Sequence, residues 1–377
     1  MQVDENVSLE WDNMLAGIHA QVELLTRAPR ELYAQVSDAL PPDRVPGFIY
    51  AAGCGDSYYA AIATRLALMR WTGLMVEPLE SLEFSRYLVD FAPPDAMVIA
   101  ISNSGKVART VEAAMAARER GLMTVGLSYN RQGRLGQVVA APVFYAYPEV
   151  GFGPGTLSYL GTLLGLYAIG LRVARLRGRL TDAQVDHELA RLEAQADVVR
   201  ATIERARAAL VSLAEATPRE RPVFLVGGGP SYGSALFGMA KLIEAARQNA
   251  VAQELEEWAH EQYFCTGPGT LTFMWAPPGR SLGRAREQLA AVRDVGGQSV
   301  AFVAEGDRET ASLADFTVAI PGVDDETLTP ISYVVPIEVY AHAFASSKGL
   351  TMLGFDDPNR MSVNFRQIFG SRVETRP

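Results

Sequence analysis

Continuous apolar runs alternate with segments of helical periodicity along most of this 377-residue chain. Met97–Ile101, Met123–Leu127 and Val143–Tyr147 are runs of this kind, and helical patterns separate them. A strand that is covered by helices on both faces is apolar throughout, as in parallel sheets. The pattern therefore predicts an α/β fold in which strands and helices alternate.

The same pattern occurs twice in the chain. Ala52–Tyr58 (AGCGDSY) corresponds to Val226–Tyr232 (VGGGPSY), an offset of 174 residues (226 − 52). Later runs stay opposite one another, as Met97–Ile101 and Leu271–Trp275 do. Each copy reads as strand, glycine turn and helix, which predicts two tandem doubly wound parallel-sheet domains. Because the copies differ in their polar residues, we expect a site built from both halves.

Helical spacing also marks the segments outside the two copies. Residues 1–44 are expected to be an N-terminal helical arm, because apolar residues recur at helical spacing from 8 to 40 and Pro41-Pro42 follows; such arms often reach a partner subunit. The first domain is placed at 45–176, and the charged stretch 177–220 is expected to form connecting helices. The second domain is placed at 221–350. Residues 351–377 have no counterpart in the first copy and are expected to fold over a site.

Composition narrows the class of protein. Charged residues make up 20% and hydrophobic residues 49% of the chain, which argues against disorder and fibrous architecture. A net charge of −9 without a basic stripe argues against a nucleic-acid partner. Cys54 and Cys265 are the only cysteines and lack metal-ligand spacing, so neither a disulfide framework nor a zinc site is expected.

Neither a signal peptide nor a membrane span is expected. The acidic segment Met1–Glu10 lacks the basic and apolar regions of a signal peptide. The longest apolar stretch, Leu160–Leu171, is too short to span a bilayer and predicts a buried helix. We therefore expect a cytoplasmic protein with no membrane partner and no metal or organic cofactor.

Polar loops follow the strands of the first copy, where ligands bind in doubly wound sheets. These loops are Gly53–Ser57, Ser102–Lys106 and Glu149–Thr156. The Ser-Asn-Ser-Gly sequence of the second loop gathers hydroxyls, a carboxamide and backbone N–H groups, which suits a phosphate or sugar hydroxyls. The second copy has Ala276–Pro278 at this place, so the cradle occurs once. An alternative interpretation is that these Ser and Asn residues only cap the next helix.

The second copy contributes other chemical groups. Glu244 lies on the helix that follows its glycine turn, and His260 follows sixteen residues later. A carboxylate and an imidazole are the groups that general acid–base catalysis uses most. On spacing alone, a glutamate at this place is more often a solvated helix residue and such a histidine is more often structural.

The glycine turn, the Ser102–Gly105 loop and the duplicated plan resemble the SIS (sugar isomerase) domain family, and in particular the isomerase half of the glucosamine-6-phosphate synthases. The likeness covers about residues 45–365 and implies flavodoxin-like domains and a homodimer. It implies that Glu244 is the base that moves a proton between C1 and C2, and that His260 helps to open the sugar ring, usually in the neighbouring subunit. It also implies a set of residues that line the sugar-phosphate site. These are Cys54, Ser57, Ser102, Asn103 and Ser104.

The chain departs from that family in its lysines. The synthases carry a lysine near the C-terminus that forms a Schiff base with the ketose, but Asn359–Val363 contains none, and Lys348 matches a non-catalytic lysine. The glutamine-hydrolysing half with its N-terminal cysteine is also missing from this sequence. Glutamine-dependent synthesis of glucosamine phosphate is therefore not expected.

Phosphate recognition departs from the family as well. Val107 replaces a threonine, Asp56 replaces a neutral hydroxyl, and Pro154–Thr156 replaces a Ser-Thr-Lys run. A carboxylate repels a phosphate. Lys106 or Arg109 could offset that charge, while Asp56 would equally suit an amine or the hydroxyls of an unphosphorylated sugar.

Two hypotheses of different classes follow. The first is an aldose–ketose isomerase or a fructosamine-type deglycase that works through an enediol or enaminol, with Asp56 or Glu257 helping to expel the amine in the second case. The alternative is a non-catalytic sugar-phosphate-binding regulatory protein. A nucleotide-binding Rossmann enzyme is not favoured, because the glycine turn lacks its third glycine and no acidic residue closes a recognisable second strand.

Overall fold

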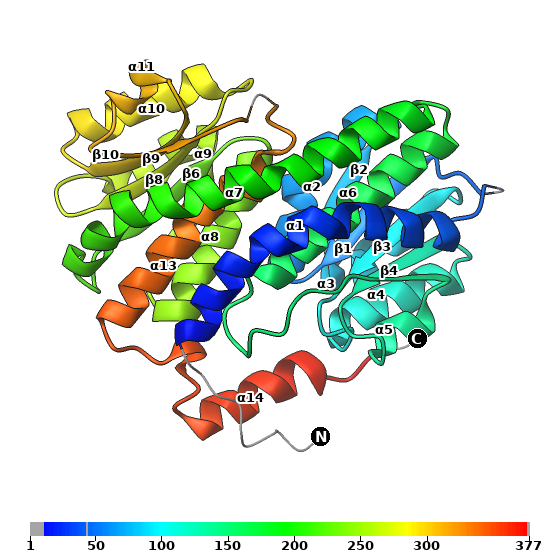
Figure 1. Ribbon diagram of the computed structural model, residues 1–377. Helices are drawn as coiled ribbons and strands as arrows, with labels where there is room; N and C mark the ends of the chain where they lie inside the picture. The colour runs from blue at the N-terminus through cyan, green and yellow to red at the C-terminus, as the bar shows by residue number, and fades with distance from the viewer. Residues whose placement is uncertain (1–10, 43, 324, 375–377) are drawn as a thin grey trace. The chain divides into compact units, whose positions relative to one another are not determined.

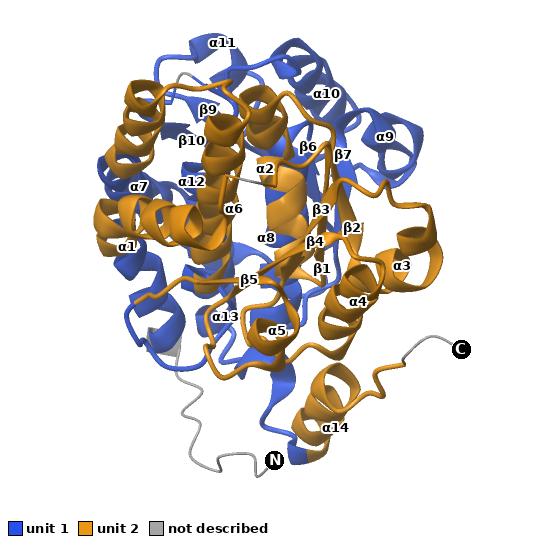
Figure 2. Ribbon diagram, turned by 90° about the vertical axis from the view of Figure 1, so that its right-hand side faces the viewer, with its two compact units in different colours: residues 1–22, 148–157, 195–358 blue, residues 23–147, 158–194, 359–377 orange. Residues whose placement is uncertain are grey.

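The computed structural model describes residues 11–42, 44–323 and 325–374, and it divides into two compact units. Unit 1 comprises residues 1–22, 148–157 and 195–358, and unit 2 comprises residues 23–147, 158–194 and 359–377 (Figure 2). Each unit contains one parallel sheet with helices (Figure 1). The fold is therefore the expected α/β architecture with two five-stranded parallel sheets and an N-terminal helix.

Unit 2 holds a sheet with strand order β2-β1-β3-β4-β5, parallel throughout. Its strands are β1 (Phe48–Gly53), β2 (Val76–Glu80), β3 (Ala96–Ile101), β4 (Met123–Ser128) and β5 (Ala141–Phe144). Every residue of β3 and β4 is buried, which is why β3 is an unbroken apolar run and β4 has only Thr124 and Ser128 as polar residues.

The helical segments of the first half are α1 (Trp11–Ala39), α2 (Asp56–Thr72), α3 (Ser81–Glu83), η1 (Phe84–Leu88), η2 (Val89–Phe91), α4 (Ala108–Glu119), α5 (Arg134–Val138), α6 (Leu157–Leu176) and α7 (Asp182–Ala216). α6 is the one helix of the described residues that is long and apolar enough to cross a membrane, and 89% of its apolar window is buried inside the protein. The prediction of a buried helix at 160–171 is confirmed. α1 and α7 each contribute residues to both units.

Unit 1 holds the second sheet, with strand order β10-β9-β8-β6-β7. Its strands are β6 (Val223–Gly227), β7 (Ala250–Glu254), β8 (Leu271–Ala276), β9 (Gln298–Ala304) and β10 (Phe316–Ile320). The accompanying helical segments are α8 (Pro230–Ala246), α9 (Leu255–His260), η3 (Gln262–Cys265), α10 (Leu282–Asp294), α11 (Arg308–Ala311), α12 (Thr329–Ser332), α13 (Val335–Ser347) and η4 (Met352–Gly354). Read from β7, this order matches that of the first sheet. α14 (Pro358–Phe369) follows near the end of the chain.

The edge strands β2 and β7 were not predicted from the sequence. β2 reads Val-Glu-Pro-Leu-Glu and β7 reads Ala-Val-Ala-Gln-Glu, and both are partly exposed. An edge strand tolerates proline and charge because one side of its backbone has no neighbour. β2 ends at Glu80, so the statement that no acidic residue closes a second strand is wrong; the missing third glycine still argues against a dinucleotide site.

Candidate functional site

The glycine turn of unit 2 has a backbone that only glycine adopts readily. Gly55 has φ 55° and ψ −129°, and a Cβ on Gly53 would lie 2.8 Å from the backbone of Ser57. In unit 1 the matching Gly229 has φ 57° and ψ −128°. The turn thus brings the start of α2 directly against the end of β1.

The strand order places the predicted loops of unit 2 at the carboxyl ends of neighbouring strands. β2 and β3 lie on opposite sides of β1, so the chain connections reverse direction between β1 and β3. Ligands bind at such switch points in doubly wound sheets. Ala52 pairs with Ala100, so Gly53–Ser57 and Ser102–Lys106 leave adjacent strands at nearly the same level. The first two predicted loops therefore come together.

The Ser102–Ser104 turn presents two hydroxyls side by side. Ser102 is buried, and its Oγ lies 3.5 Å from that of Ser104. Ser104 Oγ accepts a hydrogen bond of 3.2 Å from the backbone N–H of Lys106. Helix α4 has Val107 as its N-cap, without a side-chain cap, so the alternative in which Ser and Asn cap this helix is wrong.

Asn103 is fixed by aromatic residues that the sequence did not link to it. Its Oδ1 accepts hydrogen bonds from the hydroxyls of Tyr145 at 3.0 Å and Tyr147 at 3.2 Å. Burial raises the pKa of Tyr147 to about 12, although the hydrogen bond with Asn103 opposes the shift. Tyr147 also stacks on Tyr129, with ring centroids 4.3 Å apart. The carboxamide oxygen of Asn103 is thus used to hold the loop, which leaves its amide nitrogen for a ligand.

Cys54 belongs to a chain of polar contacts below the turn. Its Sγ lies 3.8 Å from Thr110 Oγ1, which lies 3.0 Å from Ser81 Oγ. Both hydroxyl residues are fully buried. The sequence did not indicate either residue, because Ser81 follows the unpredicted strand β2 and Thr110 resembles any other residue of α4. They tie the glycine turn to the segments that follow β2 and β3.

Asp56 and Ser57 are the first residues of α2 and are partly buried. A carboxylate at a helix N-terminus interacts favourably with the helix dipole. Burial raises the pKa of the Tyr145 hydroxyl, and the charges of Tyr147 and Asp56 add to this shift. The negative charge of Asp56 therefore reaches the group that holds Asn103.

The third predicted loop, Glu149–Thr156, lies in unit 1. There the Asn13 side chain donates a hydrogen bond of 3.1 Å to the carbonyl of Phe152, and the Phe152 ring stacks on Phe355 with centroids 6.2 Å apart. Its assignment to the same binding site as the loops of unit 2 stays a prediction.

Glu244 lies near the end of α8 and forms an ion pair with a buried lysine. Lys241 Nζ donates a hydrogen bond of 2.5 Å to Glu244 Oε2. The Lys241 side chain is fully buried and lies 4.8 Å from the centre of the Phe237 ring, whereas the Glu244 side chain is 32% exposed. A buried ammonium group requires such a partner. The carboxylate is therefore held in place yet accessible.

His260 ends α9 and is open to solvent. Its side chain is 67% exposed, and Nε2 lies 3.5 Å from Glu256 Oε1. Glu256 is in turn paired with Arg284 at 2.7 Å. This exposure is unlike that of a histidine that packs in a core, so the imidazole is available to a ligand or to another chain.

Within unit 1, Glu244 lies towards the amino ends of the strands, and His260 lies towards their carboxyl ends. α8 starts at the carboxyl end of β6, and Glu244 is about 21 Å farther along the helix at 1.5 Å per residue. β7 then returns to the carboxyl edge, where α9 begins. α9 is only about 9 Å long, too short to span back across the sheet. Within a single copy of unit 1, the two side chains therefore do not come together.

The structure describes both Lys348 and the segment Asn359–Val363, the two places where the lysines of this chain depart from the family. Lys348 Nζ donates a hydrogen bond of 2.7 Å to the carbonyl of Glu215, so this lysine closes the end of α7. Asn359–Val363 lies in α14, which has no buried residue. Among the residues that the structure describes, no group of three or more His, Cys, Asp or Glu side chains is arranged to hold a metal ion.

Comparison with known proteins confirms the resemblance stated above. The family model of the SIS domain matches residues 46–137. The isomerizing glutamine–fructose-6-phosphate aminotransferase of Mycobacterium tuberculosis is 28% identical over 307 residues, which is 80% of this chain and 48% of that protein. The chain thus spans about half the length of the curated relatives it matches.

Two solved structures share the fold. One is the C-terminal domain of glucosamine-fructose-6-phosphate aminotransferase from Francisella tularensis, with a TM-score of 0.78, 17% identity, and coverage of 93% of this chain and 99% of that one. The other is the tagatose-6-phosphate ketose/aldose isomerase from Escherichia coli, with a TM-score of 0.71, 16% identity, and coverage of 92% and 95%.

Proposed function

We propose that this chain is a sugar-phosphate enzyme of the SIS type that moves a proton between C1 and C2, as an aldose–ketose isomerase or a fructosamine-type deglycase. The observation that carries this proposal is the partly exposed Glu244 carboxylate, held by a fully buried lysine 2.5 Å away. A solvated helix residue needs no such partner, whereas a general base needs a fixed position. The names of these relatives add sugar phosphates as the substrate class.

The proposed reaction uses one group for each proton transfer. His260 donates a proton to the ring oxygen while the anomeric hydroxyl loses its proton to water, which breaks the ring C–O bond and opens the sugar. Glu244 then removes the proton from the carbon next to the carbonyl, and the electron pair moves onto the carbonyl oxygen to form an enediolate. Return of the proton to the neighbouring carbon, with transfer of the hydroxyl proton from one oxygen of the enediolate to the other, completes isomerisation. Each general acid or base contributes about 10²- to 10⁴-fold.

The deglycase branch needs one more acid, because an amine must leave. Asp56 at the start of α2 and Glu257 in α9 are the two carboxylates proposed for this role. Protonation of the enaminol at C2 gives an imine at C1, water adds to this carbon, and protonation of the leaving nitrogen then breaks its bond to C1 to release the aldose and the amine. The two branches share Glu244 and His260.

The proposal includes a homodimer in which His260 serves the neighbouring subunit. It is supported by the distance between His260 and Glu244 within unit 1. It is also supported by Tyr263 and Phe264, which follow α9 and are 37% and 78% exposed. Exposed aromatic side chains next to a polar group are typical of a surface that a partner covers. We further propose a cytoplasmic protein that binds neither membranes nor nucleic acids.

A non-catalytic sugar-phosphate-binding regulatory protein is the second candidate. The turn at Gly53–Ser57 and the Ser102–Ser104 hydroxyls meet at one switch point within unit 2. Such a cradle could bind a sugar phosphate without Glu244.

Proton NMR of a substrate panel distinguishes these functions. The panel contains hexoses, aminohexoses and fructosamine adducts, each with and without a 6-phosphate. Conversion of ketose to aldose indicates an isomerase, and release of the amine indicates a deglycase. Line broadening without conversion of any compound supports the regulatory protein and contradicts the proposed enzyme.

A further inference from the structure

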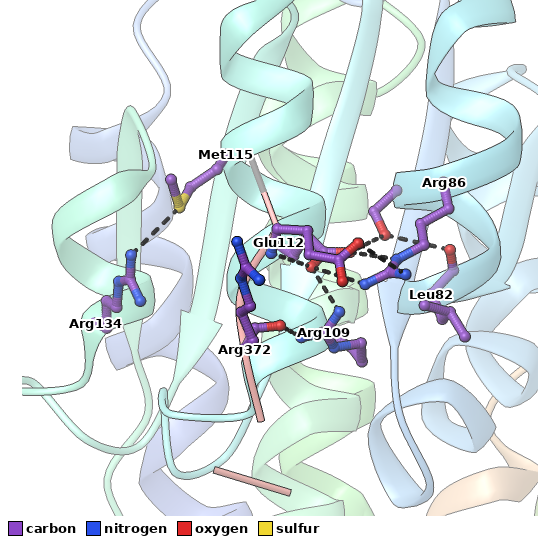
Figure 3. Close-up of polar contacts among 9 residues, drawn as sticks. Leu82, Arg86, Arg109, Glu112, Met115, Arg134 and Arg372 are labelled. Carbon is purple, nitrogen blue, oxygen red and sulfur yellow. Dashed lines mark hydrogen bonds and ion pairs between the residues drawn. The ribbon is translucent and has the colours of Figure 1, made fainter. Parts of the chain in front are cut away.

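A charge cluster in unit 2 is formed by Arg86 of η1 with Arg109 and Glu112 of α4 (Figure 3). At its centre is Glu112, which is only 4% exposed. Its carboxylate accepts hydrogen bonds from Arg86 Nε at 3.0 Å, Ser85 Oγ at 3.1 Å and Arg109 at 2.6 Å. No step of the proposed reaction uses these residues.

Residues 372–374, near the end of the chain, contact this cluster. The backbone N–H of Glu374 donates a hydrogen bond of 2.9 Å to the Glu112 carboxylate, and the Glu374 side chain pairs with Arg86 at 3.2 Å. Arg109 also donates to the carbonyl oxygen of Arg372. α14, which precedes this segment, has no buried residue. The segment 371–374 therefore makes the specific polar contacts that hold this part of the chain to α4.

The docked segment supplies part of the cluster's partners. Arg86 and Arg109 face two carboxylates, Glu112 and Glu374. Burial alone would raise the pKa of Glu112, but the hydrogen bonds from Arg86 and the Glu374 N–H, the charge of Arg109 and the Ser85 hydroxyl lower it below its usual value. Departure of the segment takes the Glu374 carboxylate away from Arg86 and one backbone N–H donor away from Glu112, so both side chains lose a partner.

These contacts bear on the ligand loop through the start of α4. Arg109 is the second residue of α4, which begins at Ala108, shortly after the turn that carries Ser102 and Ser104. The next residue, Thr110, contacts Cys54 and Ser81. One helical turn therefore joins the docked segment to both halves of the candidate cradle.

We propose that residues 371–374 form a C-terminal latch that docks on Arg86, Arg109 and Glu112 and holds the Ser102–Ser104 loop in its binding conformation. Latch docking and ligand binding are then coupled, and by linkage each strengthens the other by the same factor. Only the effect on the ligand rests on the proposed function; the docking and its effect on α4 do not.

Truncation tests the latch without disturbing a buried core. One chain ends at Gly370 and lacks the latch, and a matched control ends at Glu374 and keeps it. Hydrogen–deuterium exchange is measured over residues 102–112 in both and in the full chain. We expect about tenfold faster exchange only in the chain that ends at Gly370, since local opening sets the exchange rate. Equal exchange in all three chains overturns the latch.

A second variant pair tests the same contacts in the full chain. Glu112→Gln keeps the shape of the side chain but removes its charge, and Glu119→Gln changes an exposed residue near the end of the same helix. Glu112→Gln should expose residues 371–374 to exchange, and Glu119→Gln should not. Protection of 371–374 that is unchanged in Glu112→Gln contradicts the assigned anchor.

Fructose 6-phosphate is the probe for coupling. It should slow exchange of residues 371–374 in the full chain and bind about fivefold or more weakly to the chain that ends at Gly370. Equal affinity for the two chains overturns the coupling. If fructose 6-phosphate and the other compounds of the panel bind neither chain, the proposed function fails, while the exchange data without ligand still decide the latch.

Discussion

Lys241 and Glu244 form an ion pair in which the ammonium group is fully buried and the carboxylate is partly exposed, with 2.5 Å between Nζ and Oε2. Both residues lie on α8, one helical turn apart. Because Lys241 also lies over the Phe237 ring, its position is defined by packing as well as by charge. The pair therefore fixes the proposed base from its protein side and leaves the other side for a substrate.

The placement of His260 predicts complementation between inactive subunits. Glu244→Gln and His260→Ala should each abolish turnover alone. Mixing them under conditions that exchange subunits should restore about a quarter of the wild-type rate: random mixing makes half of the dimers mixed, and each carries one intact site. Turnover assays across mixing ratios measure this. An inactive mixture with proven subunit exchange would place His260 in the site of its own chain.

The glycine turns offer a matched pair of substitutions. Gly55→Ala and Gly229→Ala each place a side chain in a backbone region that favours glycine, with open space around the added Cβ. Each should lower the free energy of unfolding by about 1–3 kcal/mol, measured by urea denaturation. Only Gly55→Ala should also weaken binding of a sugar phosphate. Equal loss of binding in both variants would argue against a cradle at the first turn.

Ser104→Ala tests whether a phosphate occupies the cradle. A hydrogen bond to a charged group contributes about 1.5–3 kcal/mol, so the variant should bind a 6-phosphate sugar roughly ten- to a hundredfold more weakly. The unphosphorylated sugar should lose much less. Isothermal titration of both ligands gives the comparison, and an equal loss for the two would favour a neutral ligand near Asp56.

The charge cluster at Glu112 predicts a dependence of stability on pH. Its folded pKa lies below the usual value of 4.5, so the carboxylate stabilises the fold fully above about pH 4.5 and loses this effect as the pH falls through the folded pKa. Glu112→Gln has no such titration. The difference in unfolding free energy between wild type and Glu112→Gln should therefore be largest near neutral pH and shrink in acid. A difference that is constant from pH 7 to pH 3 would contradict this account.

Much of the fold could be read from the sequence because central strands carry their burial in their composition. β3, β4 and β8 are fully buried; β3 is apolar at every position, and the only polar residues of β4 and β8 are Thr and Ser. The hydrophobic pattern did not predict β2 and β7, because partial exposure at the edge of a sheet permits glutamate, glutamine and proline in a strand. Periodicity thus predicts buried elements and fails at edges.

The site was predictable where it depends on local geometry. The glycines of the first turn indicate a backbone conformation that other residues rarely adopt. The sequence did not indicate the hydrogen-bond partners of Asn103, because Tyr145 and Tyr147 are more than 40 residues away along the chain. The contact of Glu112 with Glu374 spans 262 residues and involves a backbone N–H, which no side-chain pattern encodes.

The most direct test of the central claim is proton NMR in heavy water with wild-type protein and Glu244→Gln. The carboxamide keeps the shape of the side chain but cannot accept the proton. The account predicts that deuterium enters C1 or C2 of a bound sugar phosphate with wild type, and that exchange stops in Glu244→Gln while binding persists. Deuterium entry at the wild-type rate in Glu244→Gln would contradict the assignment of the base, and binding without exchange in wild type would contradict the enzyme.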